Sequence, residues 1–211
     1  MPISTNEKLW SEVNPYFASH GFTRIDAPPQ FRKVHKGGFE CVVISVGNTL
    51  PTLAELHVGI RLDTLEQLVY QFTAGLSDYG PHSTTLITSS GRILGQPYHR
   101  FSIEQASDIY SVAEQMKQFM QSDGFAFLEK YRHLKALDAL FNDEPDEKSI
   151  YLTNELHRSL RGITLAKLAQ RDNWTQLVID YRIQLTRRGT PETAMKSYDL
   201  LADYLRYFSI N

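Results

Sequence analysis

Three ionisable side chains share one face of a predicted strand. In the segment Glu55–Leu62, side chains alternate between two faces, so Glu55, His57 and Arg61 lie together. Such a set could line a ligand groove in which the Arg61 guanidinium binds a carboxylate or a phosphate. The alternative is a solvated outer sheet face, because antiparallel sheets commonly leave one face in water. We favour the solvated face and keep these three residues as candidate ligand-binding residues.

Cys41 is the only cysteine and could be a nucleophile. His57, on a nearby predicted strand, could activate its thiol. We favour a small buried side chain instead, because Cys41 lies in an apolar run and reactive thiols need a partly exposed, electropositive site. The seven histidines lack the short spacings of a metal site. We therefore assign no catalytic residue, metal site or cofactor.

Arginines are frequent in the C-terminal part of the chain, where acidic residues lie among them. They could bind nucleic acid or an acidic partner. Ordinary solvated helix faces are the simpler interpretation, and the net charge of −2 argues against a generally basic nucleic-acid-binding protein. We expect no nucleic-acid partner. The residues concerned are Arg158, Arg161, Arg171, Arg182, Arg187 and Arg188.

The elements that must position these residues are strands around the segment 39–72. Gly37-Gly38 predicts a two-residue hairpin turn that would place Val34 opposite Cys41. In the next strand Leu56, Val58, Ile60 and Leu62 form an apolar face, which predicts burial on that side. Asp63 and Glu66 then predict a capped helix start, with Gly75 as its end.

The whole chain predicts an α+β protein. We expect an antiparallel sheet of about four to five strands packed by helices, followed by an all-helical C-terminal part. A helix is expected from Ser4 and a second one from Ser102. The polar, acidic segment 144–149 contains Pro145 and predicts a linker. The expected division is a core domain over 1–143, a linker over 144–149 and a helical subdomain over 150–211.

Composition places the chain among ordinary globular proteins, with 42% hydrophobic and 22% charged residues. A single cysteine cannot form an internal disulfide, which favours a reducing compartment. The N-terminal residues lack the apolar region of a signal peptide, and no apolar run is long enough to span a membrane. We therefore expect a cytoplasmic protein without a membrane-spanning segment.

A series of residues resembles a class of bacterial α+β domains of unknown function, in which a short helix ending in Gly-Phe leads into an antiparallel sheet. The resemblance covers residues 7–75 and rests on Trp10, Gly21-Phe22, Phe31-Arg32, Phe39-Glu40 and Val58-Gly59-Ile60-Arg61. Some domains of this style resemble immunity proteins that neutralise toxins. The resemblance implies no catalytic residue.

Two functions follow as hypotheses. The first is a non-catalytic protein-interaction module of the immunity type, in which the C-terminal helices bind a protein partner or a second copy of the chain. The second is a small-molecule-binding protein or enzyme that uses the polar sheet face around His57 and Arg61. Whether the chain is an enzyme stays open at this point, and nucleic-acid binding through the C-terminal arginines is the weakest alternative.

Overall fold

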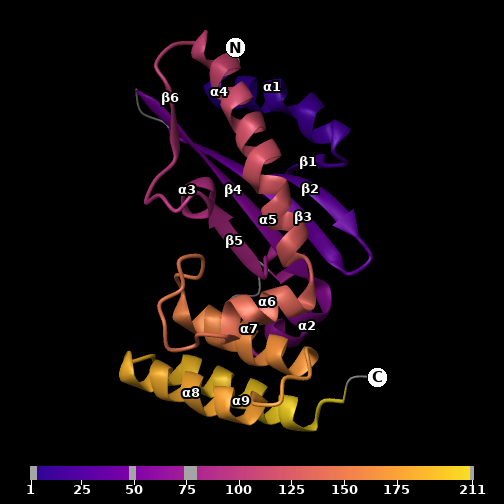
Figure 1. Ribbon diagram of the computed structural model, residues 1–211, viewed down its shortest axis with the longest axis vertical. Coiled ribbons are helices and arrows are strands. Elements are labelled where there is room, and N and C mark those ends of the chain that lie inside the picture. The colour runs from indigo at the N-terminus through magenta and orange to yellow at the C-terminus, as the bar shows by residue number, and fades with distance from the viewer. Residues whose placement is uncertain (1–3, 48–50, 74–79, 210–211) are drawn as a thin grey trace. The chain divides into compact units, whose positions relative to one another are not determined.

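The computed structural model describes residues 4–47, 51–73 and 80–209 and confirms the α+β class. A six-stranded antiparallel sheet is accompanied by helices, with a run of helices at the C-terminal end (Figure 1). The chain divides into two compact units. Unit 1 comprises Met1–Ile60 and Leu86–Lys130, and unit 2 comprises Arg61–Thr85 and Tyr131–Asn211.

The sheet is built around β4. The strand order is β1-β2-β3-β4-β5, and β6 also pairs with β4. β5 takes the His57–Ile60 half of β4, whereas β6 takes the Thr52–Glu55 half. The strands are β1 (Thr23–Asp26), β2 (Pro29–His35), β3 (Gly38–Val46), β4 (Thr52–Leu62), β5 (Leu86–Ser89) and β6 (Arg100–Ile103).

The inner face of β4 agrees with the predicted alternation at Leu56, Val58 and Ile60, whereas Leu62, predicted to be buried with them, is only partly buried. Leu56, Val58 and Ile60 are fully buried, with 0% exposure each. Removing one such side chain from water stabilises the fold by about 1.5–3 kcal/mol. The last two residues of the strand, Arg61 and Leu62, belong to unit 2.

The first hairpin turns one residue earlier than predicted. His35 pairs with Gly38 and Val34 with Phe39, so Lys36 and Gly37 occupy the turn and the predicted pairing of Val34 with Cys41 is wrong. The change moves each partner by two positions. Because side chains alternate with a period of two, every side chain keeps its predicted face.

An aromatic cluster joins the first helix, α1 (Thr5–Ser19), to the sheet. Trp10 and Phe17 stack on Phe31 of β2, with ring centroids 4.8 and 4.6 Å away. The predicted start is confirmed, since the Ser4 hydroxyl accepts the Glu7 N–H at 3.2 Å. Gly21 follows the helix with a φ of +83°, a conformation that glycine adopts without strain.

The helix start predicted at Ser102 is wrong. Residues Arg100–Ile103 form strand β6, and the helix α4 (Asp108–Phe119) begins later. The Asp108 carboxylate accepts the N–H groups of Glu104 and Gln105, both at 3.0 Å, and so holds the turn before the helix. A π-helical turn (Met120–Gly124) then continues into α5 (Phe125–Tyr131). Figure 1 shows α4 lying across the sheet.

The capping box predicted at Asp63 and Glu66 is also wrong. The helix α2 (Asp63–Tyr70) has Leu62 at its N-cap and no side-chain cap. Asp63 instead accepts a hydrogen bond from Arg61, and Glu66 turns to Ser83, Thr85 and Arg161. Gly75, the predicted end of this helix, lies outside the described residues.

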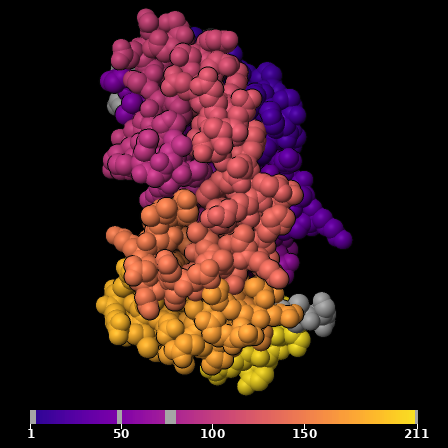
Figure 2. All heavy atoms as spheres, in the orientation of Figure 1, coloured from indigo at the N-terminus to yellow at the C-terminus, as the bar shows by residue number. Residues whose placement is uncertain are grey.

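Unit 2 contains the run of helices at the C-terminal end. They are α6 (Leu134–Asn142), α7 (Glu155–Leu168), α8 (Trp174–Arg187) and α9 (Glu192–Tyr207). The helix α7 continues through Gly162, where a Cβ would come within 2.8–2.9 Å of Asn142 and Tyr181. In Figure 2 the side chains of these helices, drawn in orange to yellow, fill the spaces between the ribbons of Figure 1.

The predicted linker at 144–149 does not coincide with the division into units, because it lies inside unit 2. The buried guanidinium of Arg158 donates to the carbonyl oxygens of Phe141, Glu144 and Glu147, at 3.2, 2.8 and 2.6 Å. These hydrogen bonds tie the polar segment to α7. Within the described ranges, no helix combines the length and apolar character needed to cross a membrane.

Candidate functional site

Two of the three predicted site residues lie in a groove of unit 1. Glu55 and His57 are partly exposed, and the His57 Nε2 atom lies 3.6 Å from a Glu55 carboxylate oxygen. Arg100 on β6 donates to the other oxygen of Glu55. Spacing along the chain could not predict this partner, since 45 residues separate Glu55 from Arg100.

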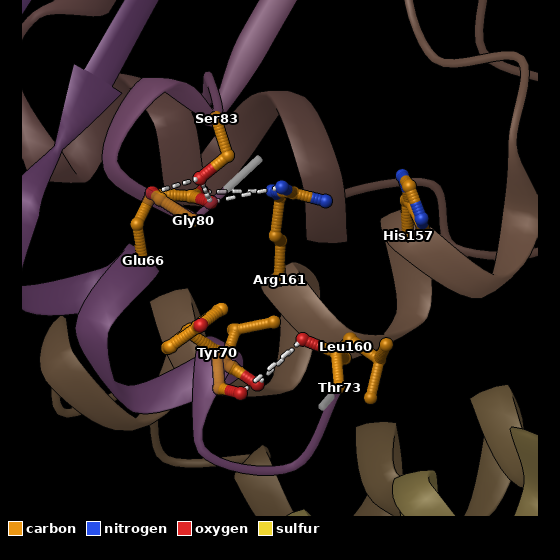
Figure 3. A pocket seen from close by; sticks show the side chains of 9 residues that line it. Glu66, Tyr70, Thr73, Gly80, Ser83, His157, Leu160 and Arg161 are labelled. Atoms are coloured by element: carbon orange, nitrogen blue, oxygen red, sulfur yellow. Dashed lines mark hydrogen bonds and ion pairs between the residues drawn. The ribbon is translucent and has the colours of Figure 1, made fainter. Parts of the chain in front are cut away.

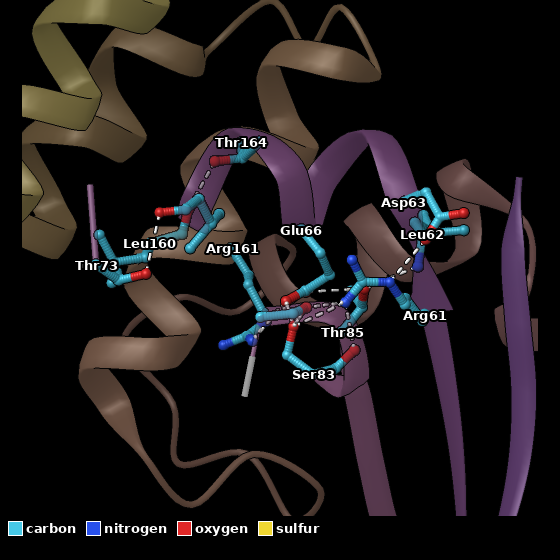
Figure 4. Close-up of polar contacts among 12 residues, drawn as sticks. Arg61, Leu62, Asp63, Glu66, Thr73, Ser83, Thr85, Leu160, Arg161 and Thr164 are labelled. Carbon is cyan, nitrogen blue, oxygen red and sulfur yellow. Dashed lines mark hydrogen bonds and ion pairs between the residues drawn. The ribbon is translucent and has the colours of Figure 1, made fainter. Parts of the chain in front are cut away.

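Arg61, the third predicted residue, is not part of that groove. It is buried at 6% exposure, and its guanidinium donates to Asp63 at 2.7 Å and to the carbonyl oxygens of Gly80 and Ser83 at 2.8 Å (Figure 4). These groups belong to unit 2. Arg61 therefore holds the chain around residues 80–83, and its guanidinium has a structural role.

Cys41 is fully buried, and burial raises the pKa of its thiol to about 12. A thiol with so high a pKa carries almost no thiolate at neutral pH, and the thiolate is the nucleophilic form. The structure therefore favours the interpretation of Cys41 as a small core side chain.

A cavity of about 170 Å³ lies within unit 2 (Figure 3). Its walls come from α2 with the turn that follows, from the 80–83 segment and from α7. The lining is mainly apolar, with a few polar groups, which is the usual character of a small-molecule site. The lining residues are Glu66, Val69, Tyr70, Thr73, Gly80, Ser83, His157, Leu160 and Arg161.

Helical spacing explains why two elements supply most of this lining. On α2, Glu66 is followed by Val69 and Tyr70, three and four positions later, which places the three on one side of the helix. On α7, His157, Leu160 and Arg161 repeat the same spacing. The Asn154 side chain caps α7 by accepting the His157 N–H at 3.1 Å, and this fixes where that side of the helix begins.

A buried ion pair forms the polar side of the cavity. Arg161 donates from Nε and Nη2 to the two carboxylate oxygens of Glu66, at 2.8 and 2.9 Å. Ser83 and Thr85 donate their hydroxyl groups to the same carboxylate, at 2.9 and 3.0 Å (Figure 4). Glu66 is 3% exposed and Arg161 is 9% exposed. Two-point contact and four donors make this a well-satisfied buried pair.

The charge state of the cavity follows from these contacts. Burial alone would raise the pKa of Glu66, but the charge of Arg161 and the hydrogen bonds from Arg161, Ser83 and Thr85 together lower it. Burial, followed by the charge of Arg161, lowers the pKa of His157. At neutral pH Glu66 is therefore ionised and His157 is neutral. The charges of Glu66 and Arg161 cancel, so the lining carries no net charge.

Most of the C-terminal arginines considered as a nucleic-acid surface have acidic or carbonyl partners. Arg171 bonds to Asp138 and Asp143, and Arg182 bonds to Asp199. Arg158 and Arg161 are buried in the contacts described above. A phosphate backbone would have to compete with these partners, so the pattern of arginines does not form a free basic surface.

Comparison with known proteins adds no relative. No family model matches the chain, and neither the curated proteins nor the solved structures contain a match. The resemblance of residues 7–75 to bacterial α+β domains thus stays a prediction. Within the described residues, no group of three or more histidine, cysteine, aspartate or glutamate side chains could hold a metal ion.

Proposed function

We propose that the protein binds a small, uncharged and mainly apolar molecule in the cavity of unit 2. The observation that carries this proposal is a mainly apolar lining beside an internally neutralised ion pair. A site of this composition takes its affinity from apolar contact and its orientation from one or two polar groups.

The size of the cavity supports a ligand built on a single ring. An apolar cavity of about 150 Å³ is large enough to hold benzene. The volume of about 170 Å³ in unit 2 leaves room for one ring and a small polar substituent. That substituent would find the guanidinium of Arg161 and the imidazole of His157, which Figure 3 shows on the same side of the cavity.

The charge balance supports an uncharged ligand. A charged molecule would lose its hydration on entry, at a cost of several kcal/mol, and would meet no unpaired opposite charge. An uncharged molecule with one hydroxyl avoids that cost. Phenol, benzoate and benzylamine share a ring and differ in charge, so they are suitable probes.

Isothermal titration calorimetry with these three probes tests the proposal. We expect phenol to bind at least about tenfold more tightly than benzoate or benzylamine, because about 1.4 kcal/mol corresponds to a factor of ten. Thr73→Trp adds a large ring at a half-buried position of the lining and should abolish phenol binding. Thr175→Trp makes the same change at an exposed position of α8 and should leave binding unchanged.

Two outcomes would overturn the proposal. One is the absence of phenol binding to the correctly folded wild-type protein at millimolar concentration. The other is equal binding of phenol to the wild type and to the Thr73→Trp variant, when circular dichroism shows that both of these proteins are folded.

Protein interaction is a second candidate function, favoured by the outer surfaces of α8 and α9. These helices expose large apolar side chains at helical spacing: Ile179 and Ile183 on α8, and Leu200, Tyr204 and Tyr207 on α9. Exposed apolar groups of this kind are common at protein interfaces. Light scattering over a dilution series, comparing the wild type with Ile179→Asp/Ile183→Asp, tests self-association. A wild type that stays monomeric at every concentration excludes the homodimer.

A further inference from the structure

The groove of unit 1 has a chemistry unlike that of the cavity in unit 2. It has a volume of about 290 Å³ and is lined by residues of β4, β5, α3 (Ser90–Ile93) and the segment Pro97–Arg100. The acidic and basic residues of its lining are Glu55, His57, Arg92, His99 and Arg100. Burial is the main cause that lowers the pKa values of His57 and His99, so both are neutral at pH 7. Two arginines and one glutamate then leave one positive charge.

The single negative charge in the groove is already engaged. Glu55 accepts a hydrogen bond from Arg100, and His57 lies beside its second oxygen. The Arg100 guanidinium also lies over the Tyr98 ring, 4.5 Å from its centroid. Arg100 is thus held between a carboxylate and an aromatic ring, which limits the hydrogen bonds that its guanidinium can donate to a ligand.

Arg92 supplies the remaining positive charge. Its side chain lines the groove and is partly buried. Over residues 4–47, 51–73 and 80–209, no carboxylate or carbonyl group accepts a hydrogen bond from its guanidinium. The charge of Arg92 nevertheless reaches His57, because it is among the causes that lower the pKa of that imidazole. A partly buried guanidinium without an internal partner can bind an anion at two points.

The far wall of the groove is fixed by close backbone packing. A Cβ on Gly91 would come within 2.8 Å of the His99 nitrogen and 3.0 Å of the Tyr98 carbonyl carbon. The Gln96 N–H donates to the Gly91 oxygen at 2.8 Å, and Ser90 and His99 are hydrogen-bonded at 3.0 Å. The segment 96–99 therefore packs directly on α3, beside Arg92, and the groove is a formed feature of unit 1.

We propose that this groove binds the carboxylate group of a small ligand through Arg92, with His57 beside the bound anion. The net charge of the groove matches a monoanion. The planar fork of a guanidinium also fits the two oxygens of a carboxylate. This site is separate from the cavity of unit 2 and does not depend on the function proposed for it.

Nuclear magnetic resonance of the His57 ring tests the proposal, with acetate as the probe and sodium chloride at equal ionic strength as the reference. The groups facing His57 are Glu55 on its own strand, Arg92 on α3 and Ser89, its pair on the adjacent strand β5. A bound carboxylate adds a negative charge beside them, so acetate should raise the pKa of His57 relative to chloride. The resonance is assigned by its loss in His57→Gln.

Variants separate the groove from general charge effects. Arg92→Gln should weaken acetate binding about tenfold or more, because a hydrogen-bonded charged contact is removed. Lys36→Gln removes the same charge from the exposed hairpin turn and should have no effect. An equal response to chloride, or an undiminished response in Arg92→Gln, would overturn the proposal. Tighter binding of inorganic phosphate than of acetate would overturn the choice of a carboxylate.

Discussion

At the scale of single residues, unit 2 depends on the pair of Glu66 and Arg161. Each partner is buried, and each would carry an uncompensated charge if the other were removed. Breaking a buried pair from one side typically costs about 3–5 kcal/mol, whereas replacing both partners by neutral groups costs much less.

We therefore expect Arg161→Met to lower the free energy of unfolding by about 3–5 kcal/mol. The double variant Glu66→Gln/Arg161→Met should recover a large part of that loss. Urea denaturation followed by circular dichroism measures both. If the effects of Arg161→Met and Glu66→Gln were additive in the double variant, the two charges would not interact as the structure indicates.

Three partly buried imidazoles give a second prediction at this scale. His57, His99 and His157 all have pKa values below the usual value of about 6.5. Below that pH the unfolded chain binds more protons than the folded chain. Stability rises with pH wherever this holds, so these residues contribute fully above about pH 6.5 and progressively less as the pH falls.

We expect the free energy of unfolding to decrease between pH 7 and pH 5, and His157→Gln to reduce the slope. Urea denaturation at a series of pH values measures it. Glu66 acts at lower pH: its pKa lies below the usual value of about 4.3, so its contribution is lost only under more acidic conditions. A free energy of unfolding that increases from pH 7 to pH 5 would contradict the expected direction of this pH dependence.

At the scale of elements, the contact of α6, α7 and α8 depends on Gly162. Asn142 donates to the Gly162 carbonyl oxygen at 2.9 Å, and the Tyr181 hydroxyl donates to Asn142 at 3.0 Å. Gly162→Ala would normally favour a helix, by about 1 kcal/mol. Here the added methyl group would press on Asn142 and Tyr181.

We expect Gly162→Ala to destabilise the protein by about 1–3 kcal/mol, the usual cost of overpacking. Thermal unfolding followed by circular dichroism measures the change. Gly189→Ala is no suitable control, because Gly189 has a φ of +69°. Gly37→Ala is suitable, since a Cβ there meets nothing within 4 Å. Equal melting temperatures for the wild type and Gly162→Ala would show that α7 can move away.

The segment 144–149 gives a second prediction for elements. Its composition is that of a linker, yet Arg158 binds the carbonyl oxygens around it. We expect Arg158→Met to increase amide hydrogen exchange in residues 141–149, while exchange in β4 stays unchanged. Rapid exchange of this segment in the wild type would support the linker that its composition predicts.

At the scale of the whole molecule, features that depend on nearby residues were predicted better than features that depend on residues far apart in the chain. The buried face of β4 and the capped start of α1 followed from residues within a few positions of each other. The helix start at Ser102 was wrong because the capping pattern there competes with pairing to β4. Strand β1 was missed because it is only four residues long and precedes Pro28-Pro29.

The candidate sites could be predicted only in part, for a physical reason. The shared position of Glu55 and His57 could be predicted, because they alternate on one strand, and both line the groove of unit 1. Arg92 and Arg100, which complete that groove, come from other elements. Glu66 and Arg161 are 95 residues apart, so no spacing along the chain joins them. The contacts of Arg61 with Gly80 and Ser83 could not be predicted, because these loop partners leave no pattern in the sequence.

A crystal structure of the protein exposed to phenol is the most direct test of ligand binding in unit 2. We expect electron density for one ring between Val69 and Leu160, with its hydroxyl directed towards Arg161 or His157. A cavity that stays free of phenol at saturating concentration, or phenol bound only elsewhere on the protein, would contradict the proposed function.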